Sequence, residues 1–160
     1  MKKNCVKKCT IWGIFIVMTA LTSMVRSHCQ IPCGIYNDPA RFDMIAEDIA
    51  TIEKSMQQIT ELSKQKNPNM NQLVRWVNNK DAHADKLSET VTYYFMTQRI
   101  KPVDKNRGKA YEEYVEKLTL LHEMLVYSMK AKQTTDLANV ERLRTLLAKF
   151  KNIYVQEHSH

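Results

Sequence analysis

The sequence predicts an all-α protein, folded as an up-down-up-down antiparallel four-helix bundle with an N-terminal metal-binding hook. Turn-forming residues are scarce, since the 160 residues include 3 Gly and 4 Pro, and a β-sandwich or barrel needs many more turns. The same scarcity disfavours a doubly wound α/β fold with glycine-rich phosphate loops. Hydrophobic residues make up 44% and charged residues 26% of the chain, as in ordinary globular proteins. Four amphipathic segments joined by short connections then predict antiparallel helices.

The chain is expected to divide into a leader peptide (residues 1–27), a metal-binding hook (28–36) and the helical bundle (37–160). The leader begins with lysines and continues with an uncharged, mainly apolar stretch of 15 residues, 11–25, whereas a helix that spans a bilayer needs roughly 20 residues. Ser27, with Val25 two positions before it, resembles a signal-peptidase site. We therefore expect cleavage after Ser27, export to the periplasm or the extracellular space, and no stable membrane association afterwards. A retained membrane anchor is the alternative.

The positive charge of the chain is concentrated in this leader. The formal net charge is +7, from 24 basic and 17 acidic residues. The leader holds five of the basic residues and none of the acidic ones, which leaves 19 basic and 17 acidic residues in the rest of the chain. Because the remaining chain has no large basic excess, binding to nucleic acid is not expected.

The first two helices are expected on either side of a break at residues 66–69. The first should run from about Pro39 to Lys64, with Pro39 in its first turn and Asp38 capping its amide groups. Its apolar stripe consists of Ile45, Ile49, Ile52, Met56, Ile59 and Leu62. The stripe of the second helix consists of Leu73, Trp76 or Val77, His83 or Ala84, Leu87, Val91, Tyr94 and Phe95. Both stripes follow the three- and four-residue spacing of a helix face.

Two further helices follow breaks at residues 102–108 and 133–136. The third stripe consists of Tyr111, Tyr114 or Val115, Leu118, Leu121, Leu125 and Met129. The fourth consists of Leu137, Val140, Leu143, Leu147, Phe150 and Tyr154. Each stripe can be buried only against the others, so the core should be shared by all four helices. The bundle carries no HExxH motif. His83 and His122 are expected to be ordinary core or surface residues, and His158 and His160 lie in the C-terminal tail.

The chemistry of the chain is concentrated in residues 28–36, which read HCQIPCGIY. Cys29 and Cys33 are the only cysteines after the leader. They could form a disulfide, or they could bind a metal, because two thiolates beside a histidine are a soft donor set. If cleavage exposes His28, its amine and imidazole, the amide and thiolate of Cys29 and the thiolate of Cys33 can bind one metal. Such a planar N/S set suits Ni(II) or Cu(II) better than Zn(II).

The string HCQIPCGIY resembles the nickel hook H-C-x-x-P-C-G-x-Y of nickel-dependent superoxide dismutases. Members of that family are four-helix bundles of similar mature length, and their Tyr-Phe pair late in the second helix has a counterpart in Tyr94-Phe95. The resemblance implies one nickel ion per subunit, with His28, Cys29 and Cys33 as metal ligands. It also implies that Tyr36 closes the axial side and positions superoxide or a water molecule without binding nickel.

The resemblance further implies the reaction and the partners. Superoxide would be converted to dioxygen and hydrogen peroxide while nickel alternates between Ni(III) and Ni(II). A processing peptidase would expose His28, and the mature protein would assemble as a homohexamer in which neighbouring subunits hold each hook. The hook is too short to build a core of its own, so this packing is physically reasonable.

The chain departs from the family pattern beside the hook. Gln30 stands where many members have Asp. Many members also have a Glu and an Arg that orient the axial imidazole, and direct matching places Ile45 or Met44 near the Glu position and Asn79 near the Arg position. Possible substitutes, left unassigned, are Glu47, Arg75 and Lys80.

Two other functions compete with the superoxide dismutase hypothesis. One is a secreted helical interaction module in which Cys29 and Cys33 form a structural disulfide. The other is a zinc- or copper-binding protein without turnover. Nickel content and superoxide consumption distinguish all three.

Overall fold

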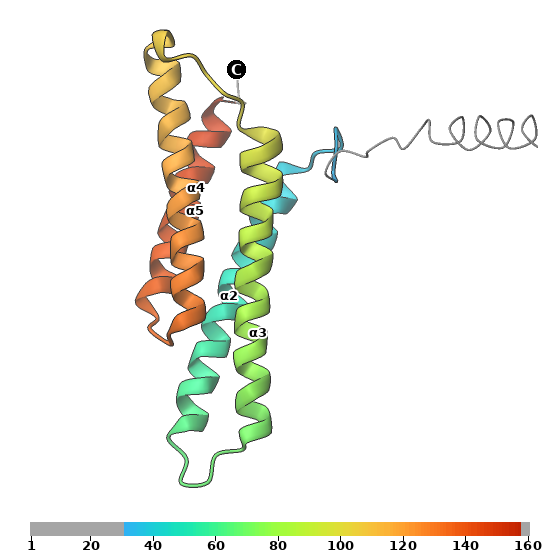
Figure 1. Ribbon diagram of the computed structural model, residues 1–160, viewed down its shortest axis with the longest axis vertical. Helices are drawn as coiled ribbons and strands as arrows, with labels where there is room; N and C mark the ends of the chain where they lie inside the picture. The colour runs from blue at the N-terminus through green and yellow to red at the C-terminus, as the bar shows by residue number, and fades with distance from the viewer. Residues whose placement is uncertain (1–30, 158–160) are drawn as a thin grey trace, which may run out of the picture. The chain divides into compact units, whose positions relative to one another are not determined.

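A computed structural model describes residues 31–157 of the chain. It contains four long α-helices: α2 (Asp38–Ser63), α3 (Met70–Glu89), α4 (Lys109–Gln133) and α5 (Ala138–Glu157). A π-helical segment, η1 (Thr90–Arg99), continues α3, and a single 3₁₀ turn, η2 (Lys105–Arg107), precedes α4. Figure 1 shows that successive helices alternate in direction. Residues 31–157 contain no β-strand, and the predicted antiparallel four-helix bundle is confirmed.

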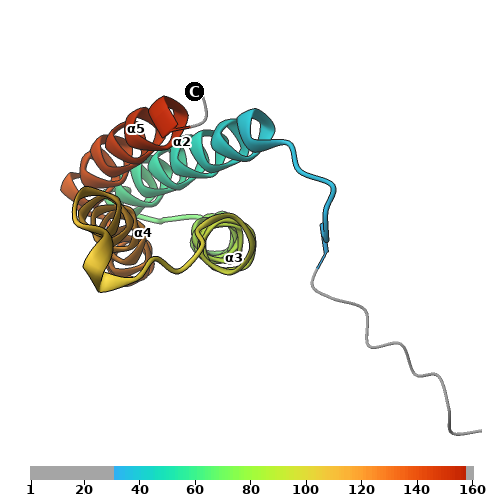
Figure 2. The same ribbon diagram turned by 90° about the horizontal axis from the view of Figure 1, so that it is seen from above.

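The four helices close into a ring. Figure 2, which looks along the bundle, shows α2 beside α3 and α5, and α4 beside the same two helices. Each helix therefore buries a face against two neighbours, as expected when no single helix can bury its stripe alone. None of the helices within residues 31–157 combines the length and the apolar character that a membrane span requires.

The start of α2 differs from the prediction. Asn37, not Asp38, is the N-cap, and its side-chain oxygen accepts a hydrogen bond from the Ala40 amide at 3.1 Å. Asp38 is already helical, and Pro39 lies in the first turn as expected. Asn and Asp are equally good N-cap residues, so their local preferences do not choose between them. The choice follows from the tertiary partners of Asp38, which are described below.

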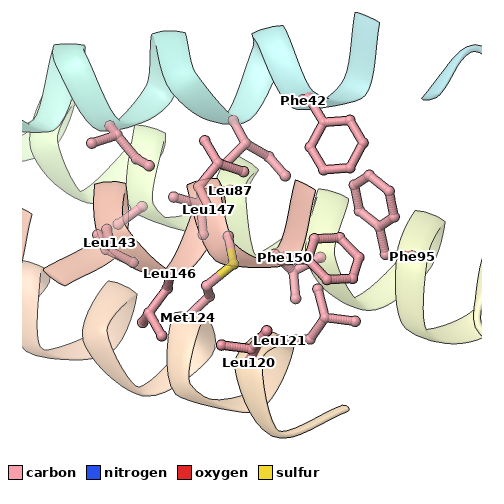
Figure 3. Close-up of a cluster of buried hydrophobic side chains, with 14 of the residues drawn as sticks. Phe42, Leu87, Phe95, Leu120, Leu121, Met124, Leu143, Leu146, Leu147 and Phe150 are labelled. Atoms are coloured by element: carbon pink, nitrogen blue, oxygen red, sulfur yellow. The ribbon is translucent and has the colours of Figure 1, made fainter. Parts of the chain in front are cut away.

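The core confirms the first stripe except Leu62, which is only partly buried, and most of the fourth, and it adds Phe42 and Leu146 to them. The side chains of Figure 3 come from all four helices, as a shared core requires. Phe42, Phe95 and Phe150 gather at one end of this core, with ring centroids 5.0 to 5.7 Å apart. This aromatic cluster lies at the start of α2, to which Phe42 belongs.

The stripe predicted for α4 is partly confirmed, since Leu121 is fully buried and Tyr114, Leu118 and Leu125 pack against the core. Val115 and Met129 are 40% and 50% exposed. The buried residues of this helix are Lys117, Leu120, Leu121, Met124, Ser128 and Ala131. The small Ser128 lets α4 approach α3 closely, and its hydroxyl donates a hydrogen bond to the Ala84 carbonyl at 2.8 Å. Packing against α3 and α5 decides between the two adjacent faces of α4. The first residue of the stripe predicted for the fourth helix also falls outside the core, because Leu137 lies before α5 and is 39% exposed.

Candidate metal centre

The described part of the hook is a turn that leads into the bundle. Cys33 and Gly34 form the turn, and Gly34 has a φ of 78°, in the left-handed region that favours glycine. Cys33 is exposed. His28 and Cys29 lie outside the described residues, so the structure places one of the three predicted ligands. Among residues 31–157, no three His, Cys, Asp or Glu side chains come together in a way that could hold a metal ion.

Tyr36 attaches the hook to the bundle. Its ring makes an edge-to-face contact with Tyr94, with the centroids 5.9 Å apart and the planes at 81°. The guanidinium carbon of Arg99 lies 4.5 Å from the centroid of the Tyr36 ring. Tyr36 nevertheless stays 40% exposed. The ring is therefore held by η1 and is still open to small molecules on one side.

Asp38 is the centre of a polar network directly beside Tyr36. Arg99 donates two hydrogen bonds to its carboxylate, from Nε to Oδ1 at 2.9 Å and from Nη2 to Oδ2 at 2.7 Å. The hydroxyl of Tyr94 donates to Oδ1 at 2.5 Å, and that of Tyr154 donates to Oδ2 at 2.8 Å. The network joins α2, η1 and α5, and so ties the beginning of α2 to the rest of the bundle.

The charges of this network are well defined at neutral pH. Burial disfavours the charged carboxylate of Asp38, but the hydrogen bonds from Arg99, Tyr94 and Tyr154 outweigh that effect and lower its pKa. The hydrogen bond to Asp38 raises the pKa of Arg99. Burial and the nearby carboxylate raise the pKa of Tyr94 to about 12. The same two causes raise the pKa of Tyr154. The network therefore contains one carboxylate, one guanidinium and two neutral phenols.

The positions matched to the family's imidazole-orienting pair carry other roles here. Ile45 is fully buried in the core, and Met44 is exposed and contacts the Arg41 guanidinium through its sulfur. Asn79 donates a hydrogen bond from its side-chain amide to Ser55 Oγ at 3.0 Å. None of these positions supplies the charged side chain that the family pattern has there.

The three residues considered as substitutes for the imidazole-orienting pair, Glu47, Arg75 and Lys80, all lie on helices α2 and α3. Glu47 and Arg75 are exposed on α2 and α3. Lys80 is 3% exposed, and its ammonium group donates hydrogen bonds to the carbonyls of Ala131 and Lys132 at the end of α4. A cation at this position stabilises the C-terminal carbonyls of a helix. Lys80 is thus committed to the fold of the bundle.

The two histidines within the described helices, His83 and His122, differ from one another. His122 is exposed, as expected. His83 forms a polar pair with Asp48, with Nδ1 2.7 Å from Oδ1, between α3 and α2. Burial raises the pKa of Asp48, and the hydrogen bond to His83 only partly offsets this effect. The prediction of an ordinary core or surface residue missed this pair, because Asp48 and His83 are 35 residues apart in the chain.

Arg99 also borders a cavity. The cavity has a volume of about 440 Å³ and is lined by residues of η1, the following loop and α4, namely Arg99, Ile100, Lys101, Val103, Arg107, Ala110, Glu113, Tyr114 and Lys117. Four of these side chains are basic and one is acidic. The surface next to Arg99 therefore carries an excess of positive charge, which favours the approach of small anions.

The sequence motifs missed Arg99, Tyr154 and the true role of Asp38. A lone arginine at the end of an apolar stripe is an ordinary feature, and nothing local marks it as a partner of an aspartate 61 residues away. The one local feature that could have pointed to this network is the position of Asp38, two residues after Tyr36 in the chain.

Comparison with known proteins gives one match. The family model described as nickel-containing superoxide dismutase matches residues 23–158. The matched range includes the whole hook and all four helices. No curated protein and no solved structure gives a significant match.

Proposed function

Since the chain belongs to the nickel-containing superoxide dismutase family, we propose that residues 28–36 form its nickel site and that His28, Cys29 and Cys33 are the ligands. The family match establishes a nickel-dependent oxidoreductase whose substrate is superoxide. The assignment of the ligands rests on the motif HCQIPCGIY, which lies inside the matched range. This is the observation that carries the proposal.

The described residues fit a metal site at this end of the bundle. Cys33 presents an exposed side chain in a tight turn, and the left-handed Gly34 after it reverses the chain. Thiolate sulfur is a soft donor, and with nitrogen donors it suits a planar nickel site. When bound, nickel supplies the redox couple, Ni(III)/Ni(II), that oxidises one superoxide to dioxygen and reduces the next to hydrogen peroxide.

The protein's own residues have three tasks in this proposal. The amine of His28, the amide of Cys29 and the two thiolates supply electron density that makes the higher oxidation state accessible. The imidazole of His28 would supply a further nitrogen donor to the ion. Tyr36 offers its hydroxyl as a hydrogen-bond donor to superoxide or to a water molecule, while Tyr94 and Arg99 hold its ring.

Metal analysis and a superoxide assay on the processed protein test the proposal. Protein beginning at His28 should contain one nickel per subunit and consume superoxide. Cys29→Ser and Cys33→Ser should each abolish activity and leave the circular dichroism of the bundle unchanged, because neither cysteine belongs to the helical core. A matched control is Ser63→Ala, at the end of α2. Retained activity in either cysteine variant would remove that sulfur from the ligand set, and zinc or copper without turnover would overturn the function.

Processing and export belong to the same proposal. Removal of residues 1–27 would expose the His28 amine that the chelate requires, and the mature protein would then lie outside the cytoplasm. N-terminal sequencing of active protein from its native host tests this step. Active protein that begins at Met1 would contradict it.

We also propose a homohexamer. Ile31 and Ile35, on either side of Cys33, are 86% and 81% exposed. Burial of such side chains against a neighbouring subunit is favourable and would order the hook. Native mass spectrometry of the nickel-loaded protein measures the assembly directly. A monomer that is fully active would show that the hook needs no neighbour.

A further inference from the structure

We propose that Arg99 is a positioning residue, which fixes the ring of Tyr36 at the base of the hook, and that the π-helical turn of η1 is what places Arg99 there. The inference rests on the role proposed above for Tyr36. It goes beyond the hook motif, because Arg99 lies in the bundle, far from the hook in the chain.

The contacts of Arg99 join two residues that are close in the sequence. Its guanidinium covers one face of the Tyr36 ring at 4.5 Å and binds both carboxylate oxygens of Asp38. Tyr154 accepts a further hydrogen bond from Nε at 2.9 Å. Asp38 thus holds the guanidinium plane of Arg99 in one orientation. That plane in turn restricts the ring of Tyr36, which lies two residues before Asp38 in the chain.

These contacts need an arginine. A planar guanidinium can lie over an aromatic ring while its edge forms a two-pronged pair with a carboxylate. A lysine ammonium is a point charge without this planar fork, so it cannot make both contacts in the same way. The side chain of Arg99 is 20% exposed and that of Asp38 is 18% exposed, so water competes only weakly for them.

The π-helical geometry explains how Arg99 reaches this position. The Ile100 amide donates to the Phe95 carbonyl at 2.9 Å, which is a hydrogen bond across five residues. The side-chain amide of Gln98 donates to the Tyr93 carbonyl across the same interval. On an α-helix, residues three and four apart share a face. With the wider turn, Tyr94 and Arg99, five apart, both reach Oδ1 of Asp38. π-Helical turns are rare in proteins, and many of those that occur lie at functional sites.

A purely structural role would account for only part of the arrangement. The pairing of Arg99 with Asp38 and Tyr154 links three elements of the bundle and would stabilise it without Tyr36. The guanidinium, however, also lies over a ring that is 40% exposed and belongs to the chain leading into the hook. A test must therefore separate loss of stability from loss of ring position.

The test uses Arg99→Met and Arg99→Gln in the processed, nickel-loaded protein, with 3-fluorotyrosine at position 36. Gln keeps an amide donor for Asp38 and lacks the cation, so it remains informative if the Met variant does not fold. The matched control is Arg144→Met, since Arg144 pairs with both oxygens of Glu53 between α5 and α2 and has no contact with Tyr36. The readouts are the ¹⁹F resonance, thermal unfolding and the rate constant of superoxide decay.

Both Arg99 variants should move the ¹⁹F resonance toward that of free 3-fluorotyrosine and slow superoxide decay about tenfold, which corresponds to the loss of one partly desolvated cation–π contact. Arg144→Met should lower thermal stability but leave the resonance unchanged and the rate within about twofold. An unchanged resonance in folded Arg99→Gln would overturn the inference, and so would an equal loss of rate in Arg144→Met. A shifted resonance with an unchanged rate would uphold the positioning of the ring and overturn the role of Tyr36 in the reaction.

Discussion

Replacement of Asp38 by Asn should destabilise the bundle by about 3 kcal/mol. The carboxylate accepts four hydrogen bonds, two from Arg99 and one each from Tyr94 and Tyr154. Hydrogen bonds to a charged group contribute roughly 1.5–3 kcal/mol each, but members of one network do not add. Removing one partner of a buried ion pair costs about 3–5 kcal/mol. The lower end applies here, because both side chains are about one-fifth exposed.

Urea unfolding followed by circular dichroism measures this loss. For a chain of this size, a loss of about 3 kcal/mol should also lower the melting temperature by roughly 6–12 °C. The control is Asp43→Asn, on the same helix, because Asp43 is exposed and its replacement should change stability by less than about 0.5 kcal/mol. A loss below about 1 kcal/mol in Asp38→Asn would refute the network as a stabilising element.

The loss of stability caused by Asp38→Asn should also depend on pH in a defined direction. The pKa of Asp38 is lowered in the folded protein relative to its ordinary value of 3.8. Its contribution to stability is therefore fully present above about pH 4 and is lost as the pH falls through the folded pKa. The difference in unfolding free energy between the wild type and Asp38→Asn should shrink over this acidic range. A difference that stays constant down to the lowest pH at which both proteins fold would contradict the assigned protonation state.

Three further predictions concern the hook and the core. One Ala retained before His28 should leave folding unchanged and reduce superoxide turnover to background, because it displaces the terminal amine from the chelate; electron spin resonance should then lack the rhombic signal of Ni(III) with an axial nitrogen. Tyr36→Phe should retain nickel and lower the rate, since Tyr36 is proposed to position substrate without binding metal; loss of nickel would show a different role. Met124→Ala should cost about 2–5 kcal/mol of unfolding free energy, whereas Met129→Ala should cost less than about 1 kcal/mol, because Met124 is fully buried and Met129 is half exposed. Equal losses would contradict the assignment of Met124 to the buried face of α4 and of Met129 to its exposed face.

Features encoded by neighbouring residues could be predicted from the sequence. The stripe from Ile45 to Ile59 is regular, and the structure buries all five of its residues. The breaks between helices are marked by residues such as Pro68 and Gly108, whose preferences are local. The hook is nine consecutive residues, so the donor atoms proposed for it follow from the motif alone. Nothing distant in the chain is needed to read any of these features.

Other features depend on contacts between distant segments, and only the tertiary structure decided them. Asn37 and Asp38 have the same local preference for capping a helix; Asn37 caps α2, and the carboxylate of Asp38 instead binds Arg99, 61 residues away. The predicted α4 stripe was only partly right, because Leu121 is buried but the adjacent Leu120, Met124 and Ser128 are buried as well, and packing of α4 against α3 and α5 sets this orientation. The π-helical turn that brings Arg99 to Tyr36 has no local sequence signal. Helical periodicity is set by neighbouring residues. The residue that pairs with a charged side chain, and the helix against which a given face packs, are set by the folded bundle.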